Sequence, residues 1–361
     1  MSVLPSDIVV YGSANMPEAD SLTIGGSVDF TKRVDFSDIT PSGTLDAVSS
    51  SASDTATQLK FGVRDPTGAE QTVTVTLTGT TPVVNAQSTE RILYGMLSNA
   101  TANGPSTAPS GTAAVGDVAL FAHSRVITTH TAQGASNSTS STPALIHLQA
   151  GDGALVAAGQ IVRILNNTPA GAQFQLRRII ATSGYGTDFV AVNRDWATAP
   201  TASTTYEILQ GMLFEILPNA VTTVVRMFAR TAADTPSGAQ RIYYEKVFLV
   251  NNNTGISLTA AQTEVASEAP TLPAGALLDM ALTNALADGG TVTNRQTAPA
   301  SGIGSFITQP SFITIPGAAN LPSGAAPNSS GAQGAWLRLT LPAGTAAYKG
   351  AGDIRTQGTT T

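Results

Sequence analysis

Alternation of apolar and polar side chains is the dominant pattern along the chain. In Gln71–Thr78 an apolar residue occupies every second position from Val73 onward, with threonines between. A period of two residues places the two kinds of side chain on opposite faces of a strand. Leu59–Val63 precedes this segment, and Asp65-Pro66-Thr67-Gly68, a turn sequence, separates the two, so they predict an antiparallel hairpin.

The rest of the first ninety residues is also β in pattern. Further strands are predicted at Ser21–Ile24, Val28–Phe30 and Arg33–Phe36. Gly25-Gly26 separates the first two, and paired glycines favour a tight turn because they accept positive φ. We expect residues 1–90 to form an N-terminal β-domain.

Short strands separated by Gly, Pro and Asn characterise the second block. They are predicted at Val118–Phe121, Ser124–Thr129, Ala144–Leu148, Gln160–Leu165, Phe174–Ala181, Asp188–Asn193 and Thr205–Leu209. Strands that recur every ~8–12 residues are typical of barrels and sandwiches. The stretches 99–114 and 133–142 are rich in Ser, Thr, Gly and Asn and predict surface loops. We expect residues 91–210 to form a β-barrel-like module.

A strand that is apolar on both faces marks the third block. Within the predicted strand Arg241–Asn251, both alternating sets of side chains from Tyr243 to Val250 are mainly apolar, as expected of a strand covered on both sides. Further strands are predicted at Met212–Ile216, Thr223–Ala229, Gly255–Leu258, Leu277–Leu282, Ser311–Ile315 and Ala335–Leu341. Ala274–Ala287 also fits a helical face, but its neighbours favour a strand. We expect residues 211–361 to form an immunoglobulin-like β-sandwich with a C-terminal tail.

A six-residue echo lies at the two borders of the second block. Ile92-Leu93-Tyr94-Gly95-Met96-Leu97 recurs as Ile208-Leu209-Gln210-Gly211-Met212-Leu213. One interpretation is that 91–210 is inserted between two similar strand ends and projects from a body formed by its flanks. Replacing 98–207 by a Gly/Ser linker would then leave a soluble protein. The other interpretation is a coincidence of common apolar residues, with the block packed centrally.

The chain is poor in charge and has no cysteine. Among its 361 residues, 18 Lys+Arg stand against 24 Asp+Glu, the net charge is −6, and charged residues make up 12%. A chain with this balance and no Lys/Arg run does not attract polyanions, so we expect no nucleic-acid partner. No apolar run approaches the ~20 residues of a membrane span, and no basic segment precedes Ile8–Tyr11. We therefore expect no membrane partner and synthesis in a cytoplasm.

Candidate catalytic residues are few. A base beside a Ser or Thr nucleophile would have to be His123, His130 or His147. The first and third lie in predicted apolar strands, where a packed or half-exposed histidine is expected, and His130 precedes a polar loop and is expected to be solvated. Asp152 and Asp188 could form an acid–base pair, but each lies in a Gly-rich turn, where Asp is common. We expect no catalytic residue and no enzymatic activity.

Other chemistry-bearing patterns are missing from the sequence. No zinc, EF-hand, phosphate-loop or dinucleotide spacing occurs, so we expect no metal-binding and no cofactor-binding residues. Trp196 and Trp336 are predicted to pack in cores, the alternative being exposed platforms for carbohydrate. Asn137, Asn166 and Asn252 begin Asn-x-Ser/Thr triplets, which chance explains in a chain so rich in Ser and Thr.

One stretch of the second block has a familiar order of elements. It runs through Gln160-Ile161-Val162-Arg163-Ile164, Ala170-Gly171-Ala172-Gln173, Leu176-Arg177-Arg178-Ile179-Ile180, Val190-Ala191-Val192-Asn193-Arg194-Asp195-Trp196-Ala197-Thr198-Ala199-Pro200 and Thr205-Tyr206-Glu207-Ile208. Over about 160–209 the chain resembles a small β-module recurrent in tailed-bacteriophage virion proteins. That module strings together a Gly-rich turn, an Arg-Ile strand, a strand ending at Trp, a Pro and a closing Tyr-x-Ile strand. Lys246–Asn253 and Trp336–Gly344 also resemble phage structural proteins.

The resemblance implies a bacteriophage virion structural protein, made in a host bacterial cytoplasm and located in the virion. We expect a capsid decoration or cement protein that stabilises the head shell, with the major capsid protein as partner and a homo-oligomer, a trimer being favoured. No long heptad pattern of a fibre shaft is present. The alternative is a tail or baseplate protein that binds host surface carbohydrate. From other classes there remain a surface-layer or adhesin module and a polysaccharide-cleaving enzyme.

Both ends of the chain are short of large apolar residues. Met1–Asp20 and Gly344–Thr361 retain β-prone residues such as Ile8–Tyr11 and Ile354, but neither can fold alone. We expect at least one end to dock on a neighbouring subunit or on the capsid protein. Deleting residues 1–15 would then leave the isolated fold intact.

Overall fold

The computed structural model describes residues 3, 7–17, 19–98, 108–133, 144–182, 186–217, 220–228, 238–253, 255–267, 272–317, 320–324, 331–345 and 352–360. Regular structure in these residues is almost entirely strand, which confirms the expected all-β, multi-domain fold. The described residues form two compact units: the first runs up to Val34 and resumes at Val225, and the second runs from Asp35 to Val224. Within the described ranges, no helix is long and apolar enough to cross a membrane.

The larger sheet of the first unit is antiparallel. Its strands in spatial order are β20 (Ile307–Thr308), β18 (Leu277–Leu286), β22 (Gln333–Leu341), β16 (Arg241–Asn251), β1 (Ile8–Asn15), β2 (Ile24–Val34) and β19 (Thr291–Val292). Every residue of β16 from Tyr243 to Asn251 is buried, as its doubly apolar pattern predicts. The ambiguous segment 274–287 contains β18, so it is a strand.

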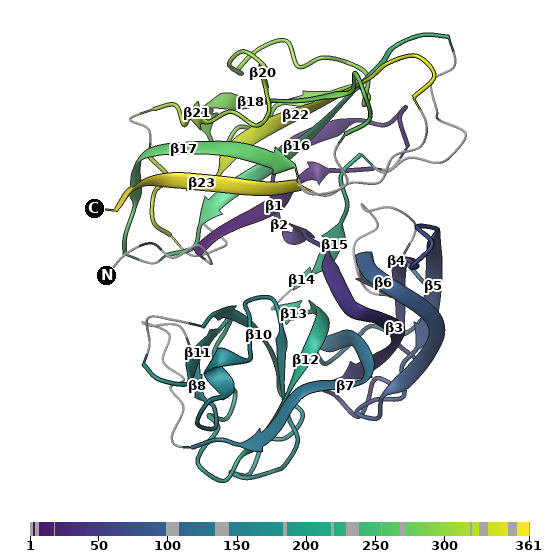
Figure 1. Cartoon of the computed structure of the whole chain (residues 1–361), viewed down its shortest axis with the longest axis vertical. Coiled ribbons are helices and arrows are strands. Elements are labelled where there is room, and N and C mark those ends of the chain that lie inside the picture. Colours follow the sequence, from purple (N-terminus) through teal and green to yellow (C-terminus); the bar gives the residue numbers. More distant parts are fainter. Residues whose placement is uncertain are drawn as a thin grey trace. The chain divides into compact units, whose positions relative to one another are not determined.

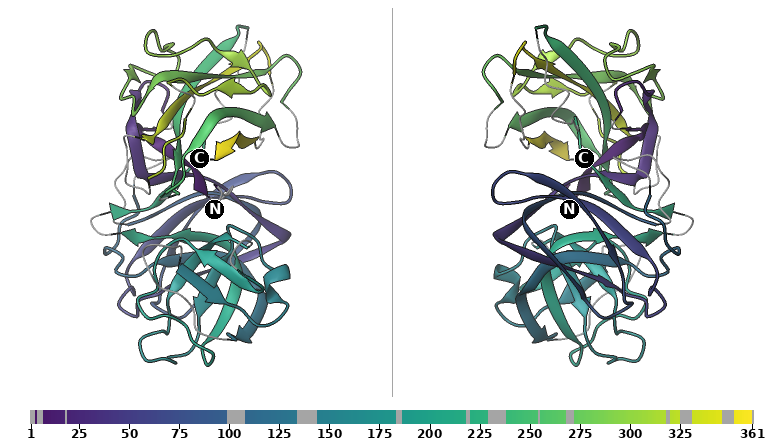
Figure 2. Two further views of the ribbon diagram at one scale, coloured as in Figure 1. Left: turned by 90° about the vertical axis from the view of Figure 1, so that its left-hand side faces the viewer. Right: turned by 90° about the vertical axis from the view of Figure 1, so that its right-hand side faces the viewer.

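A smaller sheet completes a β-sandwich in the first unit. Its order is β21 (Ile313–Thr314), β17 (Leu258–Ser267) and β23 (Gly352–Thr360), and β17 and β23 lie side by side in Figures 1 and 2. Val247 of β16 and Met280 of β18 share one core with Ala261 and Val265 of β17. The apolar faces of the two sheets therefore bury one another, as in other sandwiches.

The described residues of the second unit form three apolar clusters, of which the two largest are the cores of its two halves. Strands β5 (Glu70–Thr76), β4 (Gln58–Arg64), β6 (Val83–Leu97), β3 (Ser37–Ser49), β7 (Val118–Thr131) and β12 (Thr205–Phe214) pair in that spatial order. They enclose a core that includes Leu45, Phe61, Leu120 and Phe214. The β4–β5 hairpin is the one that the sequence predicts. Three short strands follow β12: β13 (Ile216–Leu217), β14 (Ala220–Val221) and β15 (Thr223–Val225).

The second core of this unit lies inside a small barrel. The far halves of β7 and β12 continue into β9 (Ile161–Ile164), β10 (Leu176–Ala181), β11 (Phe189–Val192) and β8 (Ala144–His147), each paired with the next. The N–H of Gln133, just after β7, donates to the His147 carbonyl at 3.2 Å and closes the ring of strands. Trp196 and Tyr206 pack at its centre. The segment that carries the phage resemblance thus supplies β9 to β12.

The boundaries expected near residues 90 and 210 are not those of the structure. The chain divides instead at Val34/Asp35 and Val224/Val225. The strand β12 runs without a break through residue 210, and β1 and β2 belong to the sandwich rather than to an N-terminal domain. Alternation predicts each strand locally but carries no information about which distant strand it pairs with.

The block 91–210 shares a core with residues that precede it in the chain. β7 pairs with β3 over Leu45–Ser49, and Leu120 and Met212 share a core with Ile39 and Leu45. Replacing 98–207 by a linker would remove β7 and part of β12 and open that core to water. The block therefore forms part of the second unit together with residues 35–90.

The six-residue echo has a packing explanation at its glycines. A Cβ on Gly95 of β6 would lie 2.4 Å from Cζ of Phe214, and one on Gly211 of β12 would lie 2.0 Å from the Leu120 carbonyl oxygen. Each strand needs a glycine where another group approaches its backbone closely. The similarity reflects two close approaches in one unit and does not mark the ends of an inserted domain.

Both terminal segments pair within their own unit. β1 lies between β16 and β2, and β23 pairs with β17. The expectation that residues 1–15 are dispensable for the isolated fold is wrong, because their removal would leave β16 and β2 without their shared neighbour. Ile8 and Ile354, two of the β-prone residues of the terminal segments, pack against the sandwich core.

Candidate functional site

Asp152 lies at the centre of a buried hydrogen-bond cluster in the small barrel. Its side chain is 4% exposed, and its Oδ2 lies 2.5 Å from the Tyr206 hydroxyl, 2.8 Å from Nδ1 of His130 and 3.1 Å from Oγ1 of Thr128. Tyr206 on β12 stands opposite His130 on β7, so the strand ladder brings these side chains together. The 3-10 turn Asp152–Ala154 delivers the carboxylate, and the Gln149 N–H donates to the Tyr206 hydroxyl at 2.9 Å.

The cluster keeps Asp152 ionised. Burial by itself raises the pKa of this carboxyl, but the hydrogen bonds from Tyr206, His130 and Thr128 outweigh burial and lower it below its ordinary value. Burial, followed by the bond to Asp152, raises the pKa of Tyr206. A carboxyl that serves as a general acid needs the opposite, a raised pKa. The geometry suits Asp152 to fix the side chains around it.

The histidine of this cluster does not have the geometry of a general base that activates a nucleophilic hydroxyl. Oγ1 of Thr128 lies 2.7 Å from Nδ1 of His130, the same nitrogen that contacts Asp152. A nucleophilic relay places the hydroxyl and the carboxylate on opposite ring nitrogens. His130 is partly exposed, as expected of a solvated residue, yet it is also anchored to a buried carboxylate, which the sequence did not indicate.

The other candidate residues have separate structural roles. Nδ1 of His123 lies 2.8 Å from Oδ1 of Asp46, and the His147 ring stacks on Phe189 with centroids 4.0 Å apart. Oδ1 of Asp188 accepts the N–H of Gly153 at 2.9 Å. Asp188 therefore supports the turn that carries Asp152, in agreement with the interpretation of both as turn residues.

Both tryptophans are core residues. Trp196 is 4% exposed, donates its indole N–H to the Leu145 carbonyl at 3.0 Å and has the Arg177 guanidinium 5.2 Å from its ring centroid. Trp336 is 1% exposed and packs with Ile24 and Tyr244. This confirms the expectation of core packing and excludes either ring as an exposed carbohydrate platform.

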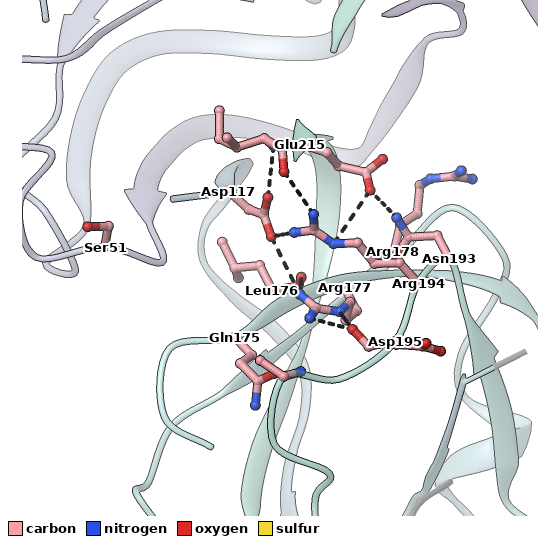
Figure 3. A network of polar contacts seen from close by, with 12 residues as sticks. Ser51, Asp117, Gln175, Leu176, Arg177, Arg178, Asn193, Arg194, Asp195 and Glu215 are labelled. Atoms are coloured by element: carbon pink, nitrogen blue, oxygen red, sulfur yellow. Dashed lines mark hydrogen bonds and ion pairs between the residues drawn. The ribbon is translucent and has the colours of Figure 1, made fainter. Parts of the chain in front are cut away.

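A second polar cluster of the second unit joins residues at or near the ends of several strands (Figure 3). Its charged members are Asp117, Arg177, Arg194 and Glu215. Asp117 pairs with Arg194, lies 3.5 Å from Nη1 of Arg177 and accepts the Ile216 N–H at 2.9 Å. Arg194 in turn donates to the Ile216 carbonyl at 3.0 Å. Asp117, just before β7, thereby holds Arg177 of β10, Arg194 just after β11 and the start of β13.

Arg177 is the most enclosed cation of this cluster. Nε and Nη2 donate to the Asp195 carbonyl at 3.0 and 2.7 Å, and Nη1 donates to the Leu176 carbonyl at 2.7 Å. Burial lowers its pKa to about 10, while Glu215 and the Asp195 side chain oppose the shift. Arg177 therefore stays charged at neutral pH. Sequence reasoning missed it, because Arg177 and Arg178 are adjacent in β10 and their pattern does not show which of the two is buried.

A buried lysine forms the corresponding centre of the first unit. The Lys246 side chain on β16 is 0% exposed, and Nζ donates to Oδ2 of Asp288 at 2.5 Å. Nζ also lies 2.8, 3.0 and 3.2 Å from the carbonyl oxygens of Asp288, Gly26 and Gly290, so its three N–H groups are shared among four acceptors. Burial lowers the pKa of Lys246, and Asp288 opposes that shift. Four acceptor oxygens surround Nζ, as expected for a charged ammonium group. Lys246 thereby connects β2 and the β18–β19 loop to β16.

Metal-ligand clusters and modification triplets add no further site. Among the residues that the structure describes, no group of three His, Asp or Glu side chains could hold a metal ion. The amide of Asn166 donates to the Ser203 carbonyl at 2.9 Å and that of Asn252 to the Tyr11 hydroxyl at 3.2 Å. Asn137 lies outside the described residues.

Comparison with known proteins gives no relative: no protein-family model, no curated protein and no solved structure matches the chain.

Proposed function

We propose that this chain is a bacteriophage virion structural protein, a capsid decoration or cement protein that binds the major capsid protein and stabilises the head shell. The observation that carries the proposal is the resemblance of residues 160–209 to a β-module of phage virion proteins. The proposal is supported by the way these residues fold, as the consecutive strands β9 to β12 around Trp196. A homo-oligomer, with a trimer favoured, and location in the virion belong to the same proposal.

The chemistry of the polar clusters is compatible with a structural role. Asp117, Asp152 and Lys246 each tie several chain segments together from a buried position. A protein that clamps capsomers has to resist local opening when the shell is strained. Buried charges whose partners come from separate strands oppose such opening, because separating them leaves an unpaired charge in the interior.

The proposal is tested on particles from cells that carry the coding sequence. Tailed particles are purified and labelled with gold-conjugated antibody against the chain, and particles from a deletion strain are compared by the temperature at which heads release DNA. We expect label over the head and a lower release temperature without the protein, since binding to the intact shell stabilises it. Label at the tail tip would overturn the cement function, and selective binding on a glycan array would favour the carbohydrate-binding alternative.

A further inference from the structure

β5 is an edge strand of the second unit in the part of the chain that the structure describes. Among the residues that the structure describes, only β4 pairs with it, in a ladder from Gln58↔Thr76 to Arg64↔Glu70. The strand begins at the exposed Glu70, but from Gln71 to Thr78 the segment has no charged residue and no proline, and four of its positions are threonine. Natural edge strands are usually blunted by charge, proline or a bulge, because an open row of backbone groups pairs readily with another strand.

The direction of the free backbone groups follows from the hairpin. The Asp65 N–H donates to the Ala69 carbonyl at 2.9 Å, and the Leu77 N–H donates to the Thr57 carbonyl at 2.9 Å. Ala69 and Leu77, like the odd-numbered residues between them, therefore turn their backbone groups toward β4. Residues alternate in an antiparallel ladder, so the N–H and C=O groups of the even-numbered threonines in β5 face outward. Thr72, Thr74 and Thr76 are all exposed.

The other long edge strand of the protein differs. β23 is also paired on one side only among the described residues, but it carries the exposed Asp353 and Arg355 near its start. Charges of this kind discourage another strand from pairing with the edge. The contrast within one chain singles out β5 as the edge left open for a partner.

The sequence of β5 indicates which strand fits. Thr72-Val73-Thr74-Val75-Thr76 reads the same in both directions about Thr74. We propose that β5 pairs antiparallel with β5 of a second copy of this chain, about a two-fold axis through Thr74. Thr72 then stands opposite Thr76 of the second copy, and Val73 stands opposite its Val75. On each face of the joined sheet, a side chain of one copy therefore meets the same type of side chain from the other copy.

This register agrees with the charges and faces of the strand. Glu70 then stands opposite Thr78 of the second copy, so its carboxylate meets no like charge. Val75 is buried and Val73 half-buried on the core side of β5, and the pairing extends that apolar side across the axis. The contact does not depend on the proposed function, and a trimer formed through another surface could use it to join neighbouring trimers.

Cysteine cross-linking of the full-length protein tests the register, because the natural chain has no cysteine. Directly opposed residues of a hydrogen-bonded pair have Cα atoms about 5.5 Å apart, which is within the range for a disulfide. T74C should form a disulfide-linked dimer under mild oxidation, at least about tenfold faster than T359C on β23, because pairing holds the two thiols at high effective concentration. T72C and T76C should cross-link when mixed and only slowly when alone.

A charge test supplies an independent measurement. T74K and T74E each place like charges together at the axis, so sedimentation of either variant alone should show loss of the dimeric contact, and an equimolar mixture should regain it. T359K is the matched control and should behave as wild type. The proposal is overturned if T74C cross-links no faster than T359C, if T72C with T76C gives no mixed dimer, or if association of the full-length protein is unaffected by T74K and T74E.

Discussion

The hydroxyl of Tyr94 on β6 lies 2.6 Å from Oγ1 of Thr72 on β5, although β4 separates these two strands. The contact is possible because the Tyr94 ring crosses β4 directly over Gly62, where a Cβ would lie 2.0 Å from Cε1 of the ring. A glycine in mid-strand, which by itself weakens a strand, here makes room for a side chain that spans three strands.

Substitution of Gly62 should therefore destabilise the second unit. G62A forces the Tyr94 ring to move and should lower the free energy of unfolding by about 1–3 kcal/mol, as overpacking usually does. Urea denaturation followed by tryptophan fluorescence measures the change. G255A is the control, since a Cβ at Gly255 meets no atom within 4 Å. An equal effect of G62A in the presence and absence of Y94L would contradict the steric explanation.

Removing the buried ammonium of Lys246 should be more costly. K246M leaves Asp288 and three carbonyls without their shared donor, and the loss of one partner of a buried pair costs about 3–5 kcal/mol. R241M on the same strand is the matched control, because Arg241 is exposed. Calorimetry should show a lower transition temperature for K246M alone, and equal temperatures for the two variants would refute the role of Lys246.

Asp152 should make the second unit sensitive to acid. Its pKa is lower in the folded chain than its ordinary value of 3.8, so its contribution is complete above that value and is lost as the pH falls through the folded-state pKa. D152N should cost roughly 1.5–3 kcal/mol at neutral pH, because charged acceptors bind more strongly. Below pH 3.8 the difference between D152N and wild type should shrink, as measured by urea unfolding at several pH values. A constant difference down to pH 2 would exclude this assignment.

The two ends of the chain should differ in importance. Deleting residues 1–15 removes a central strand, and the cooperative unfolding transition of the first unit should disappear. Deleting residues 352–361 removes an edge strand whose only core side chain is Ile354, so the transition should persist at a lower temperature. Calorimetry of both truncations decides the matter, and retention of the transition without residues 1–15 would contradict the central position of β1.

Local sequence pattern identified most of the long strands but not all of their ends. The tight turn predicted at Gly25-Gly26 is wrong, because both glycines lie within β2. Alternation of side chains identified the β4–β5 hairpin and the doubly covered strand β16, because each depends on neighbours within a few residues. The choice of strand over helix for 274–287 was also correct, because the surrounding strands imposed their own geometry on it.

Only the tertiary structure decided which distant elements share a sheet and which charges share a site. Tyr11 pairs with Phe248 across more than two hundred residues, and Lys246 meets Gly26 in the same way. Such pairings are selected by the total apolar area that the assembled sheets bury. The alternation of side chains within one strand does not determine that area. The buried roles of Arg177 and Asp152 escaped the sequence for the same reason: a strand pattern shows that a charge faces inward but does not identify its partner.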